Sequence, residues 1–183
     1  MRQPREPSRH QVSAGRATRR LAVVLSVVTA LAFVAPSAHA QGKVDKITFT
    51  VTLTSQQTVL EQVGRGGTKT YGWNQLTGTA STPSGDVNVT LLGNVSYVDG
   101  SGPFYGFLTL EFASLSTLGL TLNGKAAKQA DDTTKLSSKL KVIDGNAAFT
   151  GATGTGSFTG SRAAALGSPI VIKVTVNVRG VST

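Results

Sequence analysis

Two segments near the ends of residues 41–183 alternate strictly between apolar and polar side chains. In the first, Ile47, Phe49, Val51 and Leu53 alternate with Thr48, Thr50, Thr52 and Thr54. In the second, residues 170–178, every other side chain is isoleucine or valine. A period of two places all the apolar side chains on one face of a β-strand. We therefore predict a strand at each end, with one face buried.

Short extended segments separated by glycine-, asparagine- and proline-containing turns lie between these two. We predict further strands at 58–63, 70–80, 87–92, 94–98, 104–112, 115–122 and 136–143. The polar segment 125–134 contains the one plausible helical turn, at 126–130. Many short strands separated by turns favour an all-β sandwich or barrel. Because pairing the first strand with the last removes the sheet edges, we predict a single antiparallel closed β-barrel of about eight strands.

The first 40 residues have the pattern of a signal peptide. Basic residues at 16–20 precede an apolar run at 21–35, and Ser37-Ala38-His39-Ala40 supplies small side chains before the predicted cleavage between Ala40 and Gln41. A membrane anchor is the alternative, but the run is shorter than the about 20 residues that span a bilayer. We expect a signal peptide at 1–40, a barrel domain at 41–183, secretion, and no transmembrane segment after cleavage. Residues 18–21 partly match the twin-arginine signal, so the export route stays open.

The composition of residues 41–183 excludes several kinds of chemistry. Both histidines, His10 and His39, lie before the predicted cleavage, and the remainder contains no His, Cys or Met. Triads that depend on histidine, and the usual zinc and haem sites, therefore cannot form. We expect no metal and no cofactor, although Asp131 and Asp132 form either a solvated loop pair or a weak calcium site.

General acid–base chemistry would fall to carboxylates and tyrosines. Within the predicted strands, Glu61 and Glu111 are the carboxylates in apolar patterns. Counting by two places Tyr105 and Glu111 on one strand face, which favours a solvated, outward Glu111. If a polar pocket opens inside the barrel instead, Glu111 with Tyr105 is the best acid–base pair. Whether the protein is an enzyme stays open.

Aromatic and basic residues suggest possible partners. Tyr71 and Trp73 lie two residues apart, on one face of a strand. Either both rings stack on a ligand such as a sugar, or one ring packs in the core and the other lies at the rim of the barrel. Residues 41–183 carry 12 basic and 8 acidic side chains, with lysines concentrated at 125–141. This modest surplus, without interleaved aromatic residues, argues against nucleic-acid binding. It favours a salt-dependent attraction to an anionic cell envelope.

The glycine-rich segment 144–160 is the most distinctive part of the sequence. It lacks the Gly-Lys-Ser/Thr element of a phosphate loop, so we expect Phe149 and Phe158 to pack inward around flexible glycines. Residues 144–156, followed by 169–178, resemble the glycine-rich bend and last strand of the bacterial allene oxide cyclase-like and dirigent-like barrels. Ala147 departs from that pattern, at a position where the family has glycine.

The resemblance implies an eight-stranded barrel around an apolar cavity. Members of that superfamily cyclise a reactive intermediate or steer a coupling reaction, but no catalytic residue of theirs can be matched here. Three hypotheses follow: a non-catalytic binding or envelope-associated protein that holds a small apolar ligand, a cofactor-free cyclase or stereo-directing protein, and a structural cell-surface module. A cavity lined by Glu111 or Glu61 would favour the second, and a filled barrel the third. The resemblance also implies a possible homo-oligomer.

Overall fold

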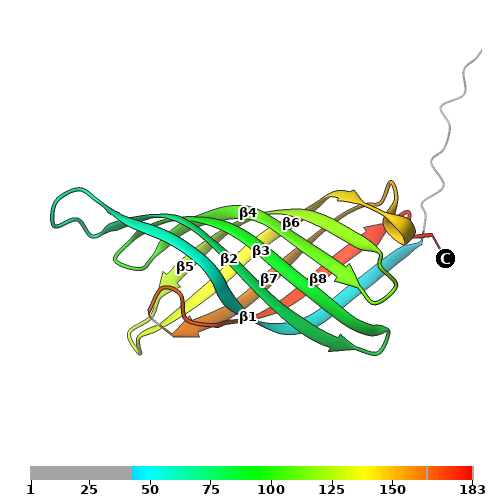
Figure 1. The fold of residues 1–183 in the computed structure, drawn as a ribbon, viewed down its shortest axis with the longest axis horizontal. Coiled ribbons are helices and arrows are strands. Elements are labelled where there is room, and N and C mark those ends of the chain that lie inside the picture. The colour runs from blue at the N-terminus through cyan, green and yellow to red at the C-terminus, as the bar shows by residue number, and fades with distance from the viewer. Residues whose placement is uncertain (1–42, 164, 183) are drawn as a thin grey trace, which may run out of the picture. The chain divides into compact units, whose positions relative to one another are not determined.

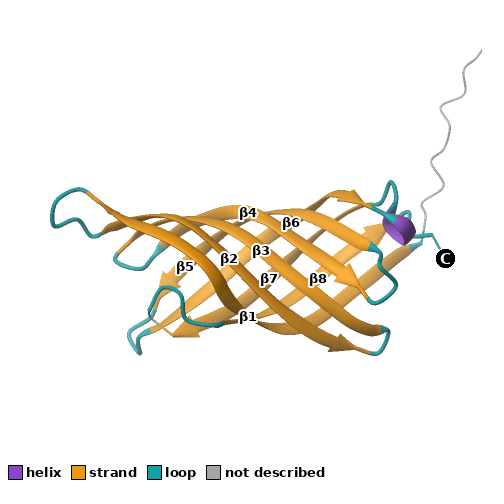
Figure 2. Cartoon of the chain, viewed as in Figure 1, coloured by secondary structure: helices purple, strands orange, loops and turns teal. Residues whose placement is uncertain are grey.

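A computed structural model describes residues 43–163 and 165–182, so the predicted signal peptide and its cleavage site lie outside the described residues. Eight strands follow one another along the chain (Figure 1), and one short 3-10 helix, η1, lies between the sixth and seventh (Figure 2). The elements are β1 (Val44–Val63), β2 (Lys69–Thr82), β3 (Gly85–Val98), β4 (Gly102–Phe112), β5 (Thr117–Lys128), β6 (Thr133–Gly145), η1 (Ala147–Phe149), β7 (Thr153–Ala163) and β8 (Ile170–Arg179).

The strands form one closed antiparallel barrel. Each strand pairs with the next, and β1 pairs with β8 from Val44 opposite Arg179 to Leu53 opposite Ile170. The two strictly alternating segments therefore lie side by side, as their patterns predicted. Because every strand is paired on both sides, the sheet has no free edge, which excludes a sandwich and confirms the predicted closed barrel.

The alternating pattern decides which side chains enter the barrel. Along β8, Ile172, Val174, Val176 and Val178 are fully buried, whereas the side chains between them face outward. Each such aliphatic side chain contributes about 1.5–3 kcal/mol by leaving water. Phe149 and Phe158 are buried too, which confirms their predicted inward packing.

The strands differ from the prediction in several places, and β7 lies in the glycine-rich region where no strand was predicted. β1 continues through residues 54–63, with a register shift between Ser55 and Gln57, and β3 continues through Gly93. The predicted helical turn at 126–130 is wrong, because β5 extends to Lys128. Ala126 is buried in the barrel opposite Leu136, so tertiary pairing overrides the helical preference of alanine there.

The connections divide the barrel into two ends. The β1–β2, β3–β4, β5–β6 and β7–β8 connections lie together at what we name the mouth end, on the left in Figure 1. The other connections, with η1, lie at the opposite end, which we name the far end. Residues 54–63 of β1 pair only with β2, because β8 begins opposite Leu53, and this hairpin protrudes at the mouth end. No helix in the described part of the chain has the length and apolarity needed to cross a membrane.

Candidate ligand-binding site at the barrel mouth

The middle and the far end of the barrel are filled mainly with aliphatic side chains. At most 2% of each of these side chains is exposed: Leu53, Leu108, Leu110, Leu118, Leu120, Ile172, Val174, Val176 and Val178. At the far end, the rings of Phe112 and Phe149 pack with their centroids 5.0 Å apart. A ligand therefore has no room in the middle of the barrel.

A cavity of about 70 Å³ opens at the mouth end. Its apolar walls are Leu76, Leu91, Val95, Phe104, Leu136, Phe158, Leu166 and Ile170, and its polar side chains are Asn74, Tyr97, Arg162 and Ser168. Phe104 and Phe158 stack with centroids 5.9 Å apart and an interplanar angle of 16°. Gly124 makes this stack possible, because a Cβ at that position would overlap the Phe104 ring.

Tyr97 is the first polar group at the cavity wall. It occupies an inward position near the end of β3 and is 4% exposed. Burial raises the pKa of Tyr97 to about 12, although the nearby Arg162 charge acts in the opposite direction. The phenol is therefore neutral at physiological pH. No group in the described residues forms a hydrogen bond with its hydroxyl, so that hydroxyl can donate to, or accept from, a ligand in the cavity.

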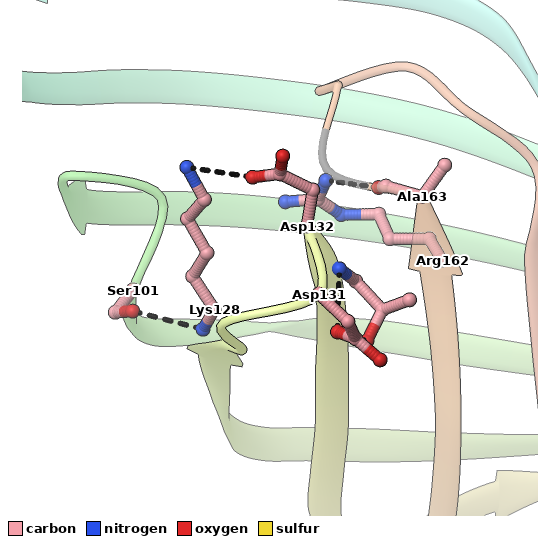
Figure 3. A network of polar contacts seen from close by, with 7 residues as sticks. Ser101, Lys128, Asp131, Asp132, Arg162 and Ala163 are labelled. Carbon is pink, nitrogen blue, oxygen red and sulfur yellow. Dashed lines mark hydrogen bonds and ion pairs between the residues drawn. The ribbon is translucent and has the colours of Figure 1, made fainter.

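Arg162 is the second polar group, and it lies at an inward position of β7. Its Nη1 donates to the carbonyl oxygen of Ala163 at 2.8 Å and to that of Ala165 at 3.1 Å, as Figure 3 shows for Ala163. These bonds hold the start of the β7–β8 connection, part of which lines the cavity. Burial lowers the pKa of Arg162, and Tyr97 opposes that shift. An arginine keeps its charge in proteins, so the cavity has a cationic wall.

Polar contacts fix the rim of the mouth beside Arg162 (Figure 3). The Asp131 carboxylate accepts hydrogen bonds from the Thr133 backbone N–H at 3.0 Å and hydroxyl at 2.7 Å, and these bonds lower the pKa of Asp131. The Lys128 ammonium pairs with Asp132 at 3.3 Å, and the Lys128 backbone N–H donates to the Ser101 hydroxyl at 2.9 Å. Asp131 thus shapes the β5–β6 turn. The described residues contain no group of three metal-ligating side chains.

The candidate residues that the sequence suggested lie elsewhere. Tyr105 and Glu111 are exposed on the outer face of β4, and Glu61 is exposed on the protruding hairpin. Tyr71 and Trp73 lie on the outer side of β2, where the Tyr71 hydroxyl contacts that of Tyr105 at 3.2 Å. This hydrogen bond raises the pKa of Tyr105. None of these five side chains lines the mouth cavity.

Sequence reasoning missed Tyr97 and Arg162, yet a signal for Arg162 was present. Counting by two from Phe158 along β7 leads through Gly160 to Arg162, so a cation falls on the inward face of a strand. A buried cation on an apolar face indicates a specific environment. Tyr97 had a weaker signal, because a tyrosine at an inward position is common in ordinary cores.

No protein-family model matches the sequence, and no curated protein does. The comparison with solved structures does find similar barrels. The structure titled "Structure of the pterocarpan synthase dirigent protein PsPTS1" aligns over 77% of this chain and 97% of its own, with a TM-score of 0.52 and 14% identity. The structure titled "Structure of the pterocarpan synthase dirigent protein GePTS1" aligns over 78% of this chain and 93% of its own, with a TM-score of 0.49 and 12% identity. The chain thus has the eight-stranded barrel fold of a dirigent protein.

Proposed function

We propose that this chain is an exported barrel that binds one end of a small, mainly apolar molecule at its mouth. The observation that carries the proposal is that Tyr97 and Arg162, both buried, line the same mainly apolar cavity. Ligand sites typically combine apolar walls with a few polar groups that orient the ligand. Here those two groups suit an oxygen-bearing ligand, such as a phenol or a carbonyl compound.

The size of the cavity limits what can enter. Sites that enclose a whole drug-sized ligand measure about 300–1,000 Å³, whereas this cavity measures about 70 Å³. A group of a few heavy atoms fits, and the filled middle of the barrel stops it from going deeper. The rest of the ligand would lie between the hairpin that protrudes from the mouth and residues 166–168, which line the cavity.

A dirigent-like role is the second candidate function. The fold shared with a dirigent protein supports it, together with a cavity whose polar side chains can orient a ligand. In such a role, the apolar walls would hold a reactive intermediate that forms elsewhere, and Tyr97 would fix one oxygen. Arg162 would stabilise negative charge on that oxygen. Holding two reacting groups in one orientation is enough to select a product.

The binding proposal is tested by titrating the protein with 4-ethylphenol and following the backbone amides by NMR. We expect shifts at Gly93 and Ser168 and none on the outer face of β8. Val95→Phe, which fills the cavity, should abolish these shifts. Val171→Phe adds the same ring to the outer face of β8 and should preserve them. If the wild type shows no shifts, or if the Val95→Phe variant still shows them, a mouth site for phenols is refuted.

The dirigent-like candidate needs a separate assay. A phenol is oxidised to its radical by an external one-electron oxidant, with and without the protein, and the coupled products are separated by chiral chromatography. A dirigent-like role predicts an enantiomeric excess that depends on the wild-type protein and disappears with Val95→Phe. A racemic product despite confirmed phenol binding would leave a binding function and reject the steering one.

A further inference from the structure

The outer face of β5 to β8 carries a regular array of cations that the mouth site does not use. Cross-strand pairing arranges outward side chains into four rungs, listed from the mouth end: Lys125, Ser137, Thr159 and Lys173; Asn123, Lys139, Ser157 and Thr175; Thr121, Lys141, Thr155 and Asn177; and Thr153 with Arg179. We name these residues the cationic trough. Successive rungs are separated by roughly 7 Å along the strands. Every rung has at least one cation, and its other side chains are hydroxyls or amides.

The trough cations have no acidic partner within the described chain. The ion pairs there join Lys43 to Asp45 and Lys128 to Asp132, and both lie outside the trough. Asp144 lies on β6 just beyond the trough, where its carboxylate accepts a hydrogen bond from the Gly145 backbone N–H at 2.8 Å. The cationic charge of the trough is therefore available to an external anion.

The surface between these cations is hollowed. Three shallow depressions of about 620, 490 and 480 Å³ follow one another along the trough. The first and second share Asn123 and Lys139, and the second and third share Lys141 and Thr155. The short serine and threonine side chains between the longer lysines explain the depressions. Together they form one continuous path from Lys125 to Arg179.

We propose that the cationic trough binds an extended acidic polysaccharide. The regular cations complement carboxylates spaced along a polymer, and the serine, threonine and asparagine side chains suit the hydroxyls of its sugar rings. A single-stranded nucleic acid fits less well, because the rungs contain no aromatic side chain on which a base could stack. A membrane surface is also disfavoured, since the rungs contain no apolar side chain to enter it.

The test is a titration of the protein with polygalacturonate at low and at physiological ionic strength, monitored by calorimetry. Lys139→Glu/Lys141→Glu reverses two cations in the centre of the trough. Arg65→Glu/Lys69→Glu makes the same charge change on the protruding hairpin, where both side chains are exposed. We expect the trough variant to lose about tenfold or more in affinity and the hairpin variant to stay within about twofold. Added salt should weaken wild-type binding.

Three results would overturn the proposal: no binding of polygalacturonate at low ionic strength, equal losses in the two double variants, or tighter binding to vesicles rich in anionic lipid than to the polymer. The second would mean that only net charge matters, and the third would assign the trough to a membrane. Neutral dextran serves as the negative control. Because the trough faces outward, Val95→Phe should leave polygalacturonate binding unchanged, so this proposal stands or falls separately from the mouth site.

Discussion

The middle of the barrel and its mouth are built from the same strands but packed differently. In the middle, Leu108 and Leu120 are completely buried among other aliphatic side chains. At the mouth, inward positions hold Tyr97 and Arg162 at the wall of a cavity, and buried Thr134 pairs with Arg162 across β6 and β7. We infer that the apolar middle supplies most of the folding free energy. The mouth can therefore carry buried polar groups, which would be unfavourable in a well-packed core.

Truncating one leucine in each region gives the largest expected effect. Leu120→Ala should cost about 3–5 kcal/mol of unfolding free energy, because the tightly packed middle cannot collapse around the new space. Leu136→Ala should cost about 2 kcal/mol, since Leu136 already borders the mouth cavity. Urea unfolding of both variants measures the difference. Equal losses would mean that the mouth is packed as tightly as the middle.

Alkaline pH should lower the free energy of unfolding through the ionisation of Tyr97 at the mouth. The pKa of Tyr97 is about 12 in the folded protein against an ordinary value of 10.0, so the folded state holds the phenol proton more tightly. The resulting stability is complete below about pH 10 and is lost as the pH rises towards 12, by up to about 3 kcal/mol. Tyr97→Phe lacks this contribution at every pH. Its unfolding free energy should therefore fall less than that of the wild type between neutral pH and about pH 11.5, and parallel curves would contradict the assignment.

Removing one hydroxyl at the mouth should increase stability. The Thr134 hydroxyl is buried, and it has no hydrogen-bond partner among the residues that the structure describes. Thr134→Val keeps the shape of the side chain and removes the unsatisfied oxygen, so we expect a gain of about 1 kcal/mol. Ser138→Ala is the matched control, because the Ser138 hydroxyl donates to the Lys139 carbonyl oxygen at 3.0 Å and its loss should destabilise. A thermal melt compares the two, and a loss of stability in Thr134→Val would show that its hydroxyl is bonded in solution.

The sequence was sufficient to predict the barrel because strand pairing depends on local alternation. The patterns at 47–54 and 170–178 predicted two half-buried strands, and those strands close the ring. Boundaries were harder, since Gly93 and Ala126 have weak strand preferences of their own and are held in strands by their neighbours. The 3-10 turn Ala147–Phe149 was not predicted, because it is only three residues long and lies within a glycine-rich run that shows no periodic pattern.

The candidate site was less predictable than the fold. Tyr97 and Arg162 are 65 positions apart in the sequence and meet only because β3 and β7 face each other across the barrel interior. Alternation placed Tyr105 and Glu111 on one strand face and favoured an outward Glu111, but it did not indicate which inward side chains line a cavity. The alignment of the trough rungs likewise depends on the register across four strands, which single-strand patterns do not contain.

The pairing of β1 with β8 sets the order in which the barrel can fold. Thr48 and Thr175 hydrogen-bond across this seam although they are 127 residues apart in the chain. All other strand pairs join consecutive strands, so a growing sheet can form while the chain is being synthesised. The ring closes only when the last strand is available, and until then both edges are open to other chains. Closure over such a long loop is slow, so the time before it occurs is when this protein is most exposed to aggregation.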